Sequence, residues 1–419
     1  MRTEPANRTT CAIAGGGPAG MFLGLLLARA GVDVTVLEKH ADFLRDFRGD
    51  TVHASTLRLL DELGLSDAFN ALPHNTVQRV EFEFPGIGDV VIGDFAKLPG
   101  RYQHIAMVPQ WDLLDLLSDA AMREPTFHLR MNTEVTGPII DKDTVVGVRY
   151  RTADGEEGEL RADLTVAADG RWSSLRRSIG LRPHEFSSPI DVWWFRMSKR
   201  PGDAPSGLRA QITEREMGLT IDRGDNYQIA YINKKGFDAT LRAEGLDAFR
   251  ARLANLFPTL ADRTDEIVSL DDVKHLDVRI NRLRRWHVDG LLCIGDAAHA
   301  MSPIGGVGIN LAIQDAVATA AILAKPLLRK HISGADLAKV TRRRKLPTVI
   351  IQGMQLGLQK ALLGPLAGGK RPRFAKVPLL LFRRFPALRY LPGYLVAIGP
   401  RPEHAPAFAR STQKQPVER

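Results

Sequence analysis

Three glycines near the start of this 419-residue chain have a spacing that suggests nucleotide chemistry. A short apolar run leads into Gly15, Gly17 and Gly20, and a helix-compatible segment follows. In this pattern the first glycine allows a tight turn, the second lets a pyrophosphate approach the backbone, and the third lets the helix pack against the strand. Free amide hydrogens at the helix start attract phosphate. The loop, including Pro18 and Ala19, is therefore predicted to bind a dinucleotide.

An acidic residue, Glu38, stands at the end of the second expected strand, 32–37. Its carboxylate can accept hydrogen bonds from ribose hydroxyls and would repel an added 2′-phosphate. Strand, loop, helix and acid thus fall where a βαβ nucleotide-binding unit needs them. These residues leave NAD and FAD open, and a glycine-rich turn beside a surface glutamate is the plainer alternative.

Two later loops join this first motif. The motifs are Gly15-Gly-Gly-Pro-Ala-Gly20 with Glu38, then Ala168-Asp169-Gly170 followed by Ser173, Ser174 and Arg176, and finally Gly295-Asp296-Ala297-Ala298-His299 continuing through Pro303 to Asn310. In order and separation they resemble the group A FAD-dependent aromatic monooxygenases, the single-component family that includes para-hydroxybenzoate hydroxylase. The resemblance spans most of the chain up to Asn310.

The resemblance implies roles for several side chains. Asp296 would bind the ribityl or pyrophosphate region of FAD, and Asp169 and Gly170 would form a loop linked to both the flavin and the nicotinamide cofactor. Arg48 matches a family arginine at the FAD phosphate and ribose, although a surface salt bridge is an alternative. Gln110 stands where relatives place Arg or Gln beside the cofactor.

The third motif also has a physical reading of its own. Gly305, Gly306 and Gly308 would let backbone amides approach a flat ring, ahead of a helix expected to begin near Asn310. Amides at such a helix start can stabilise the negative charge of a reduced flavin. Val307 departs from the Gln that many relatives have at this position.

The reaction implied by the resemblance is hydroxylation of an aromatic or other electron-rich small molecule. NADH or NADPH would reduce FAD, and O2 would then form a flavin C4a-hydroperoxide that transfers one oxygen atom. Two alternatives stay open. One is an FAD-dependent reductase or dehydrogenase on the same scaffold, and the other is a non-catalytic flavin-binding protein whose basic, Leu-rich segment 370–394 contacts a membrane surface.

The elements that must position these motifs indicate an α/β fold. We expect a Rossmann-like FAD-binding domain over 1–185, with a β excursion near 77–108, that resumes over 281–330. An inserted, mainly antiparallel β-sheet would form the substrate domain over 186–280. A basic helical region with a mobile tail would follow over 331–419.

Aromatic residues of the inserted sheet are candidates for the substrate pocket, namely Trp193 and Tyr227. Because successive strand residues point to opposite faces, at most one of Trp193 and Trp194 can face that pocket, and core packing is the plainer interpretation. His299, although it lies close to Asp296, is expected to pack and hydrogen-bond rather than act as a base.

Composition argues against several other classes. Cys11 and Cys293 lie in apolar runs, which predicts no disulfide framework, no metal site and a reducing, cytoplasmic location. We expect no signal peptide or transmembrane segment, because no apolar run reaches about 18 residues. The net charge of +9 collects partly at 342–345 and beyond 370, without a nucleic-acid motif, so no nucleic-acid partner is predicted. The oligomeric state stays open.

Overall fold

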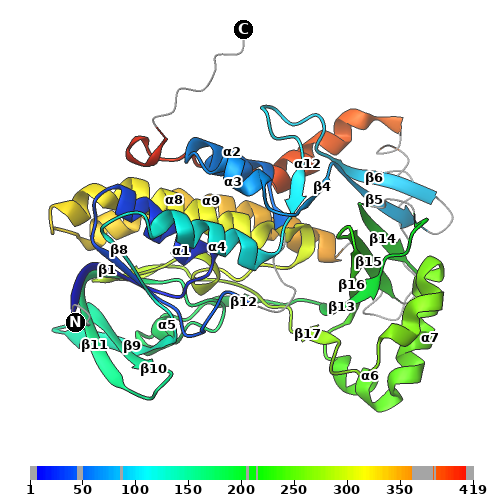
Figure 1. Cartoon of the computed structure of the whole chain (residues 1–419), viewed down its shortest axis with the longest axis horizontal. Coiled ribbons are helices and arrows are strands. Elements are labelled where there is room, and N and C mark those ends of the chain that lie inside the picture. The colour runs from blue at the N-terminus through cyan, green and yellow to red at the C-terminus, as the bar shows by residue number, and fades with distance from the viewer. Residues whose placement is uncertain are drawn as a thin grey trace, which may run out of the picture.

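The computed structural model describes residues 7–44, 51–84, 88–203, 207–213, 216–360, 381 and 384–411. Figure 1 shows two sheet-based parts joined side by side. One carries the long helices α1, α4, α8 and α9, and the other carries α6 and α7 on its outer side. This arrangement, with helices on a parallel sheet and a separate antiparallel sheet, is the expected α/β fold.

The first part is built on an eight-stranded sheet with the path β19-β20-β11-β1-β2-β8, to which β10 and β9 add beside β11. Its strands are β1 (Arg8–Ala14), β2 (Val34–Leu37), β8 (Phe127–Arg130), β9 (Thr133–Asp141), β10 (Thr144–Thr152), β11 (Glu157–Ala167), β19 (His287–Val288) and β20 (Leu291–Cys293). From β20 to β8 the neighbours are parallel. Such strands are buried on both faces, which explains the continuous apolar runs.

Helices pack around this sheet. They are α1 (Pro18–Arg29), α4 (Gln110–Ala121), α5 (Ser174–Ser178), α8 (Val307–Leu328) and α9 (Gly334–Leu358). Of these, α1, α4 and α8 pack with mainly apolar buried residues. Among the described residues, one helical stretch, Ile304–Leu328, is long and apolar enough to span a membrane by length and composition, but 78% of its most apolar part is buried inside the protein. It contains α8, whose contacts with α1 and α9 make it a core helix of the protein.

The second part is a seven-stranded sheet with the order β17-β13-β16-β15-β14-β5-β6. Its strands are β5 (Arg79–Phe84), β6 (Gly88–Asp94), β13 (Ile190–Ser198), β14 (Leu208–Ile212), β15 (Met217–Asp222), β16 (Asn226–Lys234) and β17 (Lys274–Leu276). The excursion near 77–108 thus adds two strands, β5 and β6, at one side of the sheet of the expected insertion, because β5 pairs in parallel with β14 and β6 pairs with β5. The helices α6 (Asp238–Glu244) and α7 (Leu246–Leu256) and the 3-10 helix η1 (Pro258–Glu266) cover one face.

The remaining described elements are smaller. They are β3 (Thr51–Val52), β4 (Asn75–Val77), β7 (Ile105–Met107), α2 (Ala54–Glu62), α3 (Ser66–Asn70), β12 (His184–Phe186), β18 (Ile280–Arg282), η2 (Gly295–Ala297), η3 (Ile304–Gly306), η5 (Pro386–Arg389), α12 (Tyr390–Ala397) and η6 (Ala407–Ala409). The strands β12 and β18 pair where the chain leaves and re-enters the first part. The helix α12 packs on β6, so the C-terminal region reaches the second sheet.

Candidate active site

The three sequence motifs meet because four parallel strands end at one edge of the first sheet. Leu37, Ala14, Ala167 and Cys293 lie in one register row across β2, β1, β11 and β20. The loop after each of these residues therefore emerges at the same edge. Crevices at the carboxyl ends of such strands are where open α/β sheets bind ligands.

The three glycines of the first loop have different surroundings, which explain in different ways why a residue without a side chain is needed at each position. Gly15 has φ +103°, and a Cβ there would lie 2.5 Å from the Ala168 carbonyl oxygen. A Cβ on Gly20 would collide with the Gly15 carbonyl oxygen. Around a Cβ built on Gly17, by contrast, no atom of the described residues lies within 4 Å. The second glycine therefore borders open space, as a loop that admits a pyrophosphate requires.

The start of α1 offers its amide hydrogens to an anion. Gly17 is the N-cap and Pro18 occupies the first turn. In the part of the chain that the structure describes, no side chain caps this end and no acidic residue lies in the first turn. The positive end of the helix dipole and the free amides are thus available to phosphate.

The Glu38 side chain binds backbone amides in and beside the glycine loop. Its Oε2 accepts a hydrogen bond from the Gly16 amide at 2.8 Å and its Oε1 accepts one from the His40 amide at 3.1 Å. The residue is only 7% exposed. A carboxylate oxygen can accept a second hydrogen bond, so ribose recognition stays compatible with this structural use of the side chain.

The second motif is held by its own aspartate. Asp169 Oδ2 accepts hydrogen bonds from the amides of Ser174 at 2.9 Å and Leu175 at 3.3 Å, which fixes the start of α5. Asp169 Oδ1 is buried without a hydrogen-bond partner among the described residues. Gly170 has φ +79° and open space around a built Cβ. The buried Oδ1 of Asp169, next to the free space at Gly170, could therefore accept a hydrogen bond from a bound ligand.

The third motif packs against the first and faces the second. A Cβ on Gly295 would lie 3.3 Å from the Ala19 Cβ, so this loop contacts the start of α1 directly. The Asp296 carboxylate, 32% exposed, lies 3.6 Å from the Arg171 guanidinium of the second motif. Asp296 thus lies next to the second loop, in a segment that also contacts the first, and its predicted contact with the cofactor remains a prediction.

The glycine turn before α8 is shaped by left-handed backbone conformations. Gly305 has φ +78° and Gly306 has φ +61°. The Thr51 hydroxyl donates to the Gly306 carbonyl oxygen at 3.0 Å, and a Cβ on Gly306 would strike that threonine. The helix begins at Val307 rather than near Asn310. Gly308 therefore lies in the first turn, with only Met301 Cβ, at 3.8 Å, near a built Cβ.

Asn310 has an internal role that the sequence did not reveal. Its Oδ1 accepts hydrogen bonds from the His53 amide at 3.1 Å and the Thr56 hydroxyl at 2.6 Å, and the residue is buried. It ties the start of α2 to α8 and so positions the glycine turn. Gln110 is the first residue of α4 and half-buried. Arg48 lies outside the described residues.

A buried ion-pair network supports the third motif, and the sequence analysis missed it. Asp315 Oδ2 lies 2.6 Å from His299 Nε2 and accepts the Gly295 amide at 3.1 Å, while its Oδ1 accepts Arg344 Nε at 2.9 Å. Burial alone would raise the pKa of Asp315, but His299 and Arg344 outweigh it and hold this pKa below its usual range. His299 is confirmed as a hydrogen-bonding element.

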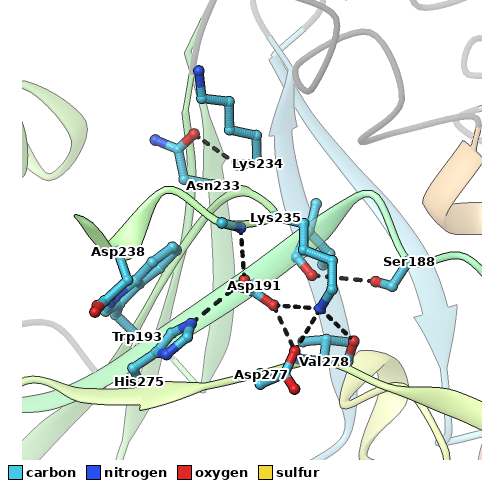
Figure 2. A network of polar contacts seen from close by, with 12 residues as sticks. Ser188, Asp191, Trp193, Asn233, Lys234, Lys235, Asp238, His275, Asp277 and Val278 are labelled. Atoms are coloured by element: carbon cyan, nitrogen blue, oxygen red, sulfur yellow. Dashed lines mark hydrogen bonds and ion pairs between the residues drawn. The ribbon is translucent and has the colours of Figure 1, made fainter. Parts of the chain in front are cut away.

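The structure corrects the prediction that Trp193 and Tyr227 line a substrate pocket. Trp193 is 0% exposed, and both rings lie in the core beneath α6 and α7, on the outer face of the second sheet. The Trp193 indole donates to Asp238 at 2.8 Å and stacks on His275 at a centroid distance of 5.1 Å (Figure 2). Alternation along the strand predicts that only one of Trp193 and Trp194 can face the pocket, but it does not determine which of the two does.

Figure 2 also shows that polar contacts on this outer face hold neighbouring segments of the second sheet together. Asp191 accepts hydrogen bonds from Lys235 Nζ at 2.9 Å, the Gly236 amide at 2.9 Å and the Val278 amide at 3.0 Å (Figure 2). Burial raises the pKa of the Asp191 carboxyl, but these donors outweigh burial and lower it overall. The network joins β13, β16 and the segment after β17, and so holds the sheet edge.

The inner face of the second sheet points toward the glycine turn. Trp194, Ala230, Leu219 and Ala210 occupy one register row across β13, β16, β15 and β14. Trp194 and Leu219 pack with Ile304 of the turn in one apolar cluster. The glycine turn thus adjoins an apolar face of the second sheet, which would help to exclude water from a ring system bound there.

Comparisons with known proteins agree with this geometry. Residues 8–346 match the family described as FAD binding domain. The chain is 33% identical over 405 residues to 6-methylpretetramide 4-monooxygenase of Streptomyces rimosus, covering 92% of this chain and 91% of that relative. Among solved structures, OxyS anhydrotetracycline hydroxylase from the same species shares 24% identity and a TM-score of 0.73, covering 93% of this chain and 76% of that one. The structure of pqsL from Pseudomonas aeruginosa, a probable FAD-dependent monooxygenase, shares 22% identity with a TM-score of 0.72. The match covers 86% of this chain and 99% of that one.

The chain belongs to this FAD-binding domain family. Its cofactor is FAD, and the enzyme is an FAD-dependent monooxygenase. The prediction from the three motifs is thus confirmed, and the reductase and non-catalytic alternatives are not favoured.

Proposed function

We propose that the enzyme hydroxylates a fused-ring aromatic small molecule of the polyketide type, using NADH or NADPH and O2. The observation that carries the proposal is the apolar face of the second sheet, with Trp194 and Leu219 at its border, which packs in one cluster with Ile304 of the glycine turn. A flat, extended ring system would find an apolar surface there over most of its area. The relatives named above, one acting on 6-methylpretetramide and one on anhydrotetracycline, support this substrate class.

The residues of this chain bind, orient and shield the cofactor. The start of α1 and Gly17 would receive the pyrophosphate, Glu38 the adenosine ribose, and Asp296 the middle of the molecule. Bound FAD supplies the redox chemistry, since it accepts hydride from a nicotinamide and in its reduced form reacts with O2. Amides at Gly306 and Val307, at the start of α8, would stabilise negative charge near the ring.

The apolar wall contributes to product formation by keeping water away from the reacting atoms. Trp194 and Leu219 would hold the substrate ring against the cofactor, which limits loss of reduced oxygen as hydrogen peroxide. A cytoplasmic location is part of the proposal, because both cysteines are free and buried.

The test is an oxygen-labelling assay on the FAD-loaded enzyme. NADH or NADPH oxidation would be followed in 18O2 with a panel of fused-ring phenols, and products would be identified by mass spectrometry. We expect one 18O atom in the product and substrate-stimulated nicotinamide oxidation. Nicotinamide oxidation that yields only hydrogen peroxide across the whole panel, or a reduced product without 18O, would contradict the proposal.

A further inference from the structure

A cavity of about 450 Å³ lies away from the FAD site, between α8, α9 and the segment that follows α12. Figure 1 shows α8 and α9 side by side, and the chain returns to them after α12. The cavity is lined by Ala318, Ala321, Ile322, Lys339, Arg342, Arg343, Arg401 and Glu403. Its walls therefore come from three separate segments of the chain.

The charge of this cavity is strongly one-sided. Four of its side chains are cationic and one, Glu403, is anionic. Glu403 is already paired with Arg343, at 2.8 Å and 2.9 Å. Among the described residues, the exposed Arg342 and Arg401 guanidiniums have neither an ion-pair nor a hydrogen-bond partner. Lys339 is paired with Asp336 at 2.7 Å, so two of the four cationic groups, Arg342 and Arg401, remain for a ligand.

A second cavity of similar size shows that this is not a general property of the surface. That cavity, of about 420 Å³, contains Arg8 and Lys330 but also Asp33 and Asp163, so its charges balance. Arg8 is paired with Asp163 at 2.6 Å. Charge complementarity therefore singles out the first cavity for an anion.

The floor of the first cavity is apolar and consists of Ala318, Ala321 and Ile322 on α8. An inorganic ion would leave this floor without a partner, whereas a small hydrocarbon group would cover it. We propose that the cavity binds an organic anion with a carboxylate or phosphate head group and a short apolar body, and that its occupancy strengthens FAD binding.

The link to the predicted FAD loop is a continuous chain of side-chain contacts, which is buried from Glu403 inward. Arg343 pairs with Glu403, which accepts Arg344 Nη1 at 3.1 Å, and Arg344 Nε donates to Asp315 at 2.9 Å. Asp315 in turn holds the Gly295 amide at 3.1 Å, directly before Asp296. A ligand that bridges α8, α9 and the segment at 401–403 holds these partners in place, so the loop that receives FAD is better ordered before FAD binds.

The binding test uses the FAD-loaded enzyme and isothermal titration calorimetry with hexanoate and hexyl phosphate as probes. Acetate supplies the head group alone and hexan-1-ol the body alone. We expect one probe molecule per chain, and at least tenfold weaker binding of acetate and hexan-1-ol. The variant Arg342→Ser/Arg401→Ser should weaken the better probe at least tenfold. Comparing the dissociation constants of hexanoate and hexyl phosphate shows whether the cavity prefers a carboxylate or a phosphate head group.

The matched control removes two positive charges from the balanced cavity, as Arg8→Ser/Lys330→Asn, and should leave the affinity within twofold of wild type. Equal binding to wild type and to Arg342→Ser/Arg401→Ser would place the probe elsewhere, for example in the substrate site, and would overturn the assignment. Absence of binding by both probes would overturn it too.

The coupling is tested by FAD titration of the FAD-depleted full-length chain. Saturating probe should lower the FAD dissociation constant at least threefold in wild type and leave it unchanged in Arg342→Ser/Arg401→Ser. Because linkage is reciprocal, the probe should bind the FAD-loaded enzyme more tightly than the FAD-depleted chain by the same factor. An unchanged FAD dissociation constant with the cavity filled would refute the coupling.

Discussion

His53 should make the stability of this enzyme depend on mildly acidic pH. The side chain is 0% exposed, and its Nδ1 lies 2.7 Å from the Val396 carbonyl oxygen. Its Nε2 is buried without a hydrogen-bond partner in the described part of the chain. Burial lowers the pKa of His53 from 6.5 to about 4, while the hydrogen bond to Val396 acts weakly in the opposite direction. The folded protein therefore holds a neutral imidazole.

The sign follows from proton binding in the two states. Between pH 6.5 and about 4 the unfolded chain protonates this histidine and the folded chain does not, so falling pH favours unfolding. The stabilisation is fully present above pH 6.5 and is lost progressively toward pH 4. At about 1.4 kcal/mol per pKa unit, the free energy of unfolding falls by about 3.5 kcal/mol in full and by about 2.5 kcal/mol at pH 4.5.

The measurement compares wild type with His53→Gln, whose amide can still donate to Val396 but does not titrate. Urea unfolding in a fixed excess of FAD, followed by tryptophan fluorescence, gives the free energy of unfolding at pH 7 and pH 4.5. Wild type should lose about 2.5 kcal/mol more than the variant over this range. The exposed His331→Gln is the control and should behave as wild type. Equal losses in wild type and His53→Gln would refute the buried neutral histidine.

Three further predictions concern the site and its support. Gly17→Ala should weaken FAD binding at least tenfold and leave the free energy of unfolding nearly unchanged. Gly20→Ala should lower the free energy of unfolding, because a Cβ there meets the Gly15 carbonyl oxygen. FAD titration measures the first effect and urea unfolding the second. Trp194→Ala should raise KM for the substrate found in the labelling assay, whereas Trp193→Ala should cost about 3 to 5 kcal/mol of stability, measured by urea unfolding. Asp315→Asn should cost about 3 to 5 kcal/mol, because it leaves a buried guanidinium without its counterion, and thermal unfolding of the FAD-depleted chain would check this.

The geometry of the predicted cofactor loops could be anticipated from the sequence because the signals are local. Gly15, Gly17 and Gly20 are constrained by a turn, a ligand approach and a helix contact, all within a few residues. The later loops at Asp169 and Asp296 follow apolar runs that end parallel strands, so their meeting at one sheet edge follows from the fold. The strand pair β9 and β10 escaped notice because nothing in its sequence marks chemistry.

What the sequence could not supply depends on contacts between distant residues. Asp315 and Arg344 lie 29 residues apart on two helices, and neither belongs to a recognisable motif. The strand β5 pairs with β14, well over a hundred residues later, and this pairing decides that the early β excursion completes the second sheet. Alternation along β13 separates Trp193 from Trp194, but the packing of α6 and α7 determines which of them is inward.

The two halves of the site should therefore respond differently to substitution. In the proposed site, FAD would be held by backbone at loops whose glycines tolerate few replacements, since a Cβ at Gly15 or Gly20 meets main-chain atoms. The proposed substrate wall consists of side chains on one face of a sheet whose opposite face carries a separate core around Trp193. Side chains on the inner row can change without disturbing that core, because successive strand residues alternate between faces. Substrate preference can thus diverge within this family at positions such as Trp194 and Leu219 while the cofactor loops stay fixed.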